Sequence, residues 1–132
     1  MEISNCDWDD ILETGKIVGE GDMAQKYQLD FSIESISRLD EMISDLWQGE
    51  QPNDINKIGW VFGCYLALII NDKFNGHWTR DAETNQIVFI SAKSQISFSP
   101  WVWVVKRFQL DESLASKSNV IFNMLTKDKQ NI

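Results

Sequence analysis

An uncharged apolar run over residues 58–70 constrains the fold of this chain more than any other feature. Because the run is apolar on every side, we expect it to form a helix that is buried all round and against which the other elements pack. Asn53 and Asp54 supply a turn and a cap before it, so the helix is predicted over residues 54–74. Gly59 and Gly63 share one face of this helix, where each costs about 1 kcal/mol relative to alanine. A close approach by a second helix would offset that cost.

The length of 132 residues fits a single domain, residues 1–132, with a core of its own. The first ten residues lack the pattern of a signal peptide, which predicts a cytoplasmic protein in a reducing compartment. The sequence leaves a disulfide between Cys6 and Cys64 open. The apolar run is shorter than the roughly 17–25 residues needed to cross a bilayer, so we expect no membrane association.

Charge is divided unevenly along the chain. Residues 1–54 contain 14 acidic and 3 basic residues, whereas residues 55–132 contain 6 acidic and 9 basic ones, which gives the net charge of −8. An acidic half repels phosphate backbones and attracts basic proteins, so a protein partner is favoured over nucleic acid. Solubility alone is the alternative explanation. Lys106 and Arg107 are too few for a nucleic-acid site and are expected at exposed positions of an amphipathic helix.

Hydrophobic spacing predicts further helices before the central one. The clearest opens at Ser32, and its apolar residues recur at steps of three and four, which forms one stripe: Ile36, Leu39, Ile43 and Leu46. A short helix is expected over residues 8–18, with Asp7 as a possible N-cap. Residues 23–28 are expected to form a short helical turn.

After Gly76 the pattern changes to short stretches rich in β-branched and aromatic residues. Residues 77–80, 86–90 and 95–98 are predicted to be strands, and an antiparallel meander over residues 77–98 is the simplest connection. Ser99 and Pro100 are typical of a helix start, whereas residues 101–105 have strand propensity. Helical spacing favours a helix to about Phe108.

Asp111 is expected to cap a final helix whose apolar residues lie on one face: Leu114, Ile121, Phe122 and Leu125. Together these patterns predict an α+β, mainly helical fold. About four to five helices should surround the central buried helix (54–74), beside a small three-stranded antiparallel sheet (77–98).

Residue types typical of catalysis are scarce in this chain. His77 is the single histidine, and a zinc site would need a cluster of cysteines and histidines. Cys64 lies in the apolar run, where burial raises the pKa of a thiol and makes it inert. Carboxylates are abundant, but no spacing singles out a pair for acid–base work. The sequence therefore predicts no catalytic residue, no metal site and no cofactor, and a protein that is not an enzyme.

Several stretches resemble a family of small bacterial cytosolic domains. They are residues 29–43, residues 63–66 (Gly-Cys-Tyr-Leu), residues 76–78 (Gly-His-Trp), residues 100–108, and residues 111–114 (Asp-Glu-Ser-Leu). Some members of this family look like immunity proteins of polymorphic-toxin and contact-dependent growth inhibition systems. The resemblance implies an α+β fold and supplies no catalytic residues.

The leading hypothesis is an immunity protein that binds a cognate toxin domain and neutralises it by occlusion. The acidic helix and the acidic N-terminal segment would cover a basic active site, and an exposed aromatic residue would anchor the contact. The residues expected to bind the partner are Asp40, Glu41, Asp45, Asp7, Asp9, Asp10 and Trp103. The alternative is a small-molecule-binding or regulatory domain with a pocket lined by Trp60, Trp78 and Phe89. The sequence leaves the toxin, the binding face and the oligomeric state open.

Overall fold

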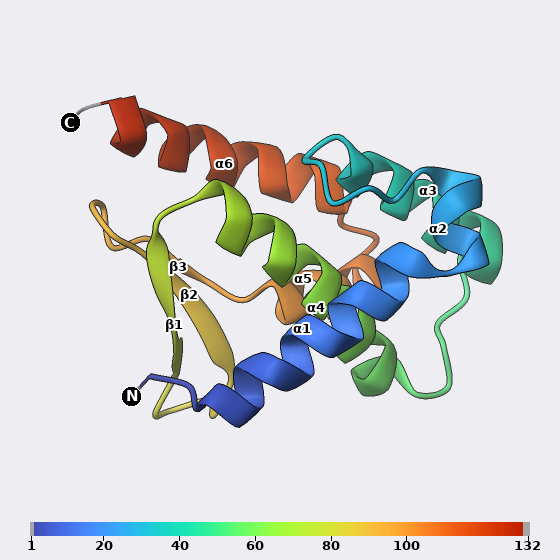
Figure 1. The fold of residues 1–132 in the computed structure, drawn as a ribbon. Coiled ribbons are helices and arrows are strands. Elements are labelled where there is room, and N and C mark those ends of the chain that lie inside the picture. Colours follow the sequence, from blue (N-terminus) through green and yellow to red (C-terminus); the bar gives the residue numbers. More distant parts are fainter. Residues whose placement is uncertain (1, 131–132) are drawn as a thin grey trace.

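The structure is a computed structural model that describes residues 2–130, with side chains described as far as Leu125. Six helices and a three-stranded antiparallel sheet make up this described part, which confirms the α+β, mainly helical fold (Figure 1). The helices are α1 (Asn5–Glu20), α2 (Asp22–Tyr27), α3 (Ser35–Trp47), α4 (Ile55–Lys73), α5 (Pro100–Gln109) and α6 (Leu114–Gln130). The strands are β1 (Gly76–Arg80), β2 (Ile87–Ser91) and β3 (Ser97–Phe98).

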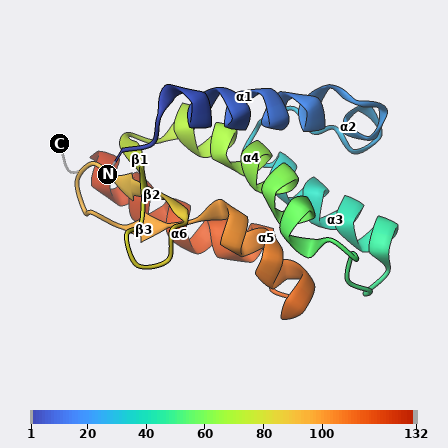
Figure 2. The same ribbon diagram turned by 90° about the horizontal axis from the view of Figure 1, so that it is seen from below.

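Helix α4 is the central element, as its apolar composition predicts. It lies between α1 on one side and α5 on the other, and most of its middle turns are buried (Figure 2). The side chain of Asp54 accepts a hydrogen bond from the backbone N–H of Lys57 at 3.2 Å, so the predicted cap is confirmed. The largest buried side chains of α4 include Tyr65, whose hydroxyl lies 2.7 Å from Ser35 Oγ and ties α4 to α3.

Glycines allow the two neighbouring helices to approach α4 closely. A Cβ atom added at Gly63 would lie 2.3 Å from Cδ1 and 2.8 Å from Cα of Trp101, so α5 passes directly over this position. At Gly59 the added Cβ would lie 2.9 Å from Val105 Cγ2, one turn further along α5. On the other side, an added Cβ at Gly15 of α1 would lie 2.9 Å from the carbonyl oxygen of Cys64. The predicted close approach at Gly59 and Gly63 is confirmed.

The sheet lies at one end of the helices and has the order β1-β2-β3, as the predicted meander requires (Figure 1). Trp78 pairs with Phe89, which in turn pairs with Phe98. These three side chains are buried on one face of the sheet, and their rings contact one another. The sheet therefore adds an aromatic layer to the core that α4 begins.

Residues 100–109 form a helix, so helical spacing outweighs strand propensity there. Pro100 is at the start of α5, where its missing N–H removes no helical hydrogen bond. Trp103 and Val104 point into the core, and the ring of Trp103 stacks on Phe98 at 5.0 Å. Packing against α4 and the sheet thus fixes the conformation of a segment whose local preferences conflict.

Three predicted helix starts are corrected by the structure. Ser4, not Asp7, caps α1, and Asp7 is instead the third helical residue of a capping box. Helix α3 begins at Ser35, because Ser32 uses its hydroxyl to accept from the backbone N–H of Ser35 in the turn before the helix. Helix α6 begins at Leu114, and Asp111 lies outside it with a positive φ of 54°.

The apolar stripe of α3 is correct at all but one position. Ile36, Leu39 and Ile43 are buried as predicted, whereas Leu46 is exposed. Met42 takes the remaining core position.

Candidate functional site

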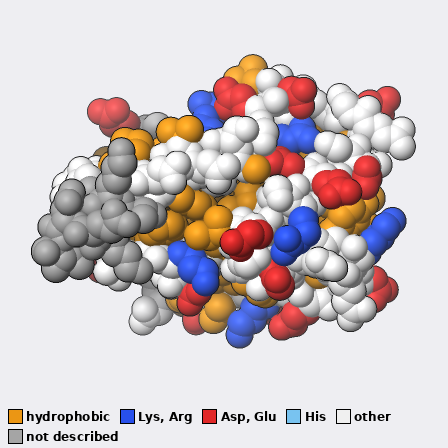
Figure 3. Space-filling view, turned by 90° about the horizontal axis from the view of Figure 1, so that it is seen from above, with side chains coloured by type: hydrophobic (Ala, Val, Ile, Leu, Met, Phe, Trp, Pro, Cys, Tyr) orange, Lys and Arg blue, Asp and Glu red, His pale blue; other side chains and the backbone are white. Residues whose placement is uncertain are grey.

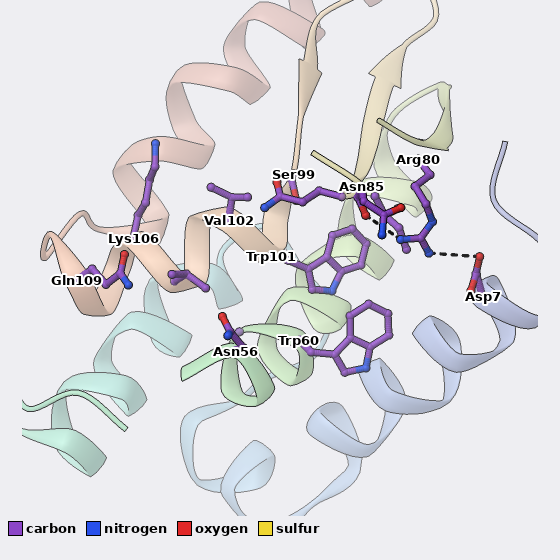
Figure 4. Close-up of a pocket in the computed structure, with 14 residues that line it drawn as sticks. Asp7, Asn56, Trp60, Arg80, Asn85, Ser99, Trp101, Val102, Lys106 and Gln109 are labelled. Atoms are coloured by element: carbon purple, nitrogen blue, oxygen red, sulfur yellow. Dashed lines mark hydrogen bonds and ion pairs between the residues drawn. The ribbon is translucent and has the colours of Figure 1, made fainter. Parts of the chain in front are cut away.

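A groove of about 440 Å³ opens between α4, α5 and the β1–β2 turn (Figure 4). Trp60 of α4 and Trp101 of α5 lie at its centre, one beneath the other. Arg80 and Asp7 form the end nearest the sheet and α1, and Lys106 of α5 lies toward the other end. The volume is in the range of sites for small ligands.

The two indole rings form a fixed aromatic floor. Their planes are nearly parallel, at 14°, and their centres are 5.5 Å apart. The indole N–H of Trp101 faces Cys64 Sγ at 3.5 Å, and its ring meets Trp78 edge-on at 5.7 Å. Because Gly63 leaves room beneath the ring, Trp101 is held flat against α4.

The charged side chains that line the groove have a net positive charge, although the protein as a whole is acidic. They are Arg80, Lys106 and Asp7, which leaves one net positive charge. Arg80 Nη2 lies 3.6 Å from Asp7 Oδ2, and Nη1 donates to the carbonyl oxygen of Asn85 at 2.8 Å. Among the side chains that the structure describes, no carboxylate lies within ion-pair distance of Lys106.

Ser99 lies where the groove meets the first turn of α5. It occupies the N-cap position, but its hydroxyl makes no capping hydrogen bond. Only 8% of the residue is exposed, and Ser99 Oγ has no hydrogen-bond partner among the described residues. A buried polar atom without a partner is uncommon, and it is explained by strain, by a bound water molecule or by a ligand group.

The pocket predicted from sequence is correct only in part. Trp60 lines the groove, but Trp78 and Phe89 are buried in the aromatic layer of the sheet. The lining residues that the sequence analysis missed include Trp101, Arg80 and Lys106. They come from segments that only the tertiary fold brings together, so no local pattern could identify them.

Asp40 is not part of an exposed acidic face. Its carboxylate accepts hydrogen bonds from Arg107 Nε at 3.1 Å and from the backbone N–H groups of Leu114 and Ala115 at 3.0 and 2.8 Å. The hydroxyl of Ser113 donates to it at 3.0 Å. The side chains of Arg107 and Asp40 are only 13% and 15% exposed, so the expected exposure of both is wrong. Asp40 caps α6 and joins it to α3 and α5.

Other predicted partner-binding residues are also engaged within the protein. Trp103 is buried, so it is not an exposed anchor. Asp45 is exposed but accepts a hydrogen bond from the Tyr27 hydroxyl at 2.6 Å, which is the main cause that raises the pKa of Tyr27 to about 12. Asp7 joins the capping box of α1 and pairs with Arg80.

Asp9, Asp10 and Glu41 are exposed, but they do not form one surface. Glu41 lies on α3, at the opposite end of the molecule from the start of α1 (Figures 1 and 2). A binding role for these residues remains a prediction.

One strip on the surface of α1 combines acidic residues with an exposed apolar one. Cys6, Asp10, Glu13 and Ile17 follow one another at steps of four, three and four residues, so they lie along one side of the helix. All four are exposed, and Ile17 is 65% exposed. We call these four residues the α1 strip. Ile17 was not among the partner-binding residues predicted from the sequence.

Figure 3 shows the face that carries α6, where hydrophobic side chains lie across the middle. Both acidic and basic side chains border them, so this face lacks a uniform charge. Helix α6 also exposes Val120, which is 63% exposed. The mixed charge distinguishes this face from the α1 strip.

Cys64 lies in the buried middle of α4, as its place in the apolar run predicts. It is fully buried, and burial raises the pKa of its thiol from the ordinary value of 9.0 to about 12. His77 lies at an exposed position of β1. Among residues 2–125, whose side chains the structure describes, no group of three or more histidine, cysteine or carboxylate side chains could hold a metal ion.

The buried thiol of Cys64 should make the protein less stable in alkali. The unfolded thiol ionises at lower pH than the folded one, so the free energy of unfolding should fall between about pH 9 and about pH 12. The slope from one such group reaches about 1.4 kcal/mol per pH unit. Urea unfolding at about pH 8 and about pH 10.5 should show a smaller difference for Cys64→Ala than for the wild type. Equal differences would contradict this assignment.

The fold and its surfaces thus define an α+β, mainly helical domain with an aromatic groove and an acidic helix surface. Within the described residues, no helix has the length and apolar character to cross a membrane. No protein-family model, curated protein or solved structure matches the chain.

Proposed function

We propose that this protein is an immunity protein that binds a basic toxin domain and neutralises it by occlusion, without catalysis. The observation that carries the proposal is the exposed side chain of Ile17 in the acidic α1 strip. An exposed apolar side chain at the end of a row of acidic ones combines the apolar and polar parts of a protein–protein contact. The resemblance of residues 29–43 and later stretches to immunity domains supports the same class.

Charge supports a basic partner. Helix α1 contains five acidic residues and one lysine, and Asp9, beside the α1 strip, is exposed as well. Complementary charges raise the rate of encounter and exclude acidic partners. Toxins that act on nucleic acids need a basic surface to hold phosphates, so such a surface would fit the α1 strip. Covering it would block access of the substrate.

Complementary charge would raise the association rate, and the burial of Ile17 on binding would add to the affinity of the complex. Acidic side chains at the edge of a contact mainly affect the association rate, whereas a buried apolar side chain slows dissociation. Glu41 and Asp45 on α3 are separate from this strip and are proposed only as a second contact.

Ile17→Asp should weaken the complex with the cognate toxin domain by about tenfold or more, because a charge would replace the apolar side chain of the contact. The matched control is Val120→Asp, since Val120 is 63% exposed on α6 against 65% for Ile17. Affinity is measured by calorimetry with both purified proteins, and protection is measured by co-expression in bacteria. Equal affinities for the two variants would exclude the α1 strip as the contact.

Cys6 supplies a direct probe of the same surface. It is exposed and belongs to the α1 strip, whereas Cys64 is buried, so alkylation by iodoacetamide reports on Cys6. Bound toxin domain should slow this alkylation, and mass spectrometry measures the extent. If the proteins neither co-purify nor protect cells, the proposed function is wrong. If they bind and Cys6 reacts at an unchanged rate, the contact lies elsewhere.

A further inference from the structure

We propose that the groove between α4, α5 and the β1–β2 turn binds a small planar organic anion, with an aromatic carboxylate as the class of ligand. The ring would stack on the indole floor, and the carboxylate would meet Lys106 and the hydroxyl of Ser99. This second site does not rest on the proposed function, since the α1 strip contributes none of its four residues to the groove.

The aromatic floor selects a planar ligand. Trp60 and Trp101 are both partly exposed, and both line the groove. Trp101 already contacts Cys64, Trp78 and Trp60, so its orientation is fixed before binding. A fixed ring loses little conformational entropy on binding, which favours stacking of a flat ligand.

The polar groups select an anion. Lys106 has no carboxylate partner among the described side chains, whereas the charge of Arg80 is balanced by Asp7 at 3.6 Å. The groove thus offers one uncompensated positive charge in a protein of net charge −8. The first turn of α5 is also part of the lining, and a helix N-terminus favours negative charge.

Ser99 is the second, independent indication of a ligand. A serine at an N-cap ordinarily accepts a hydrogen bond from the first turn, but Ser99 does not. Its hydroxyl is buried, lies at the groove and lacks a partner among the described residues. Ser99 precedes Lys106 by seven residues, which is two helical turns, so both lie on the same side of α5 (Figure 4). Their Cα atoms are about 10 Å apart along the helix, so one carboxylate would meet both groups when the long side chain of Lys106 extends toward Ser99.

The volume limits the size of this ligand. About 440 Å³ accommodates one or two fused rings with a carboxylate, and the groove is too small for a folded protein segment. The amide side chains of Asn56 and Gln86 at the rim can bind further polar substituents on the ring. The site therefore favours a compact aromatic acid over an aliphatic one.

The test uses naphthalene-2-carboxylate as the probe and its neutral isostere, naphthalene-2-carboxamide, as the matched ligand. The carboxylate should bind about tenfold more tightly than the amide, because only the carboxylate pairs with Lys106. Titration is followed by the indole N–H signals in NMR spectra, and those of Trp60 and Trp101 should shift most. Equal binding of both compounds, or shifts confined to other tryptophans, would overturn the proposal.

Substitutions of Lys106 and Ser99 test whether these residues contact the ligand or only support the fold. Lys106→Gln should weaken carboxylate binding about tenfold and leave amide binding unchanged, whereas Lys93→Gln, on an exposed turn outside the groove, should change neither. Ser99→Ala should weaken carboxylate binding by about threefold to tenfold without lowering Tm, since the hydroxyl has no partner to lose. A lower Tm with unchanged affinity would show that Ser99 is a helix cap and would overturn its assignment.

Discussion

Gly63→Ala should destabilise the protein by about 2 kcal/mol or more, although alanine is the better helix former. The new Cβ would lie 2.3 Å from Cδ1 of Trp101 and 2.8 Å from its Cα. The second distance involves backbone, so rotation of the indole cannot relieve the clash and α5 has to move away from α4. Urea unfolding monitored by circular dichroism measures the change in the free energy of unfolding.

Gly21→Ala is the control for this experiment. Its added Cβ would have no neighbour closer than 3.7 Å, and the backbone φ of −81° suits any residue. The change in the free energy of unfolding should stay within about 0.5 kcal/mol. If Gly63→Ala stabilised the protein, as a helix propensity alone would predict, α5 would not lie over Gly63 as the structure places it.

Asp40→Ala should cost about 3 kcal/mol, because it removes one partner of a largely buried ion pair. Arg107 would keep its charge at a position where its side chain is only 13% exposed. The first backbone amides of α6, at Leu114 and Ala115, would also lose their acceptor. Thermal unfolding measures the effect, and we expect Tm to fall by several degrees.

Asp111→Ala is the matched control, since Asp111 pairs with the same arginine at 3.1 Å but is 94% exposed. An exposed ion pair contributes about 0.2–1 kcal/mol, so this variant should remain close to the wild type. Equal losses for the two variants would mean that Asp40 acts only as a surface charge. Asp40→Asn would then separate charge from hydrogen bonding, because asparagine retains one acceptor oxygen.

The sequence was sufficient to predict the central helix, the meander and the place of the glycine contacts. Each of these features has a local signal in the sequence. The central helix has its apolar run, the meander has short β-branched and aromatic stretches separated by turns, and the glycine contacts have two glycines four residues apart. The conflict over residues 101–105 was also settled correctly by helical spacing. Local patterns decide such elements because each pattern specifies one geometry.

The surfaces were harder to predict, because exposure depends on partners distant in the chain. Asp40 follows the sequence pattern of a solvated helix face. Its carboxylate nevertheless accepts hydrogen bonds from Arg107 and Leu114, which are 67 and 74 residues away in the chain. Trp103 and Trp101 are two residues apart, and only the packing of α5 decides that the first is buried and the second lines the groove. No sequence pattern predicts a buried polar atom that lacks a hydrogen-bond partner, such as Ser99 Oγ.

The capping of α6 by Asp40 also affects the order in which the protein can be built. A nascent chain presents α3 long before α6 leaves the ribosome, so the acceptor for Leu114 and Ala115 already exists when those residues emerge. Helix nucleation is unfavourable for an isolated segment. The carboxylate of Asp40, if already in place, would lower the free-energy barrier to forming the first turn of α6. The last helix therefore receives its starting point from a segment synthesised much earlier.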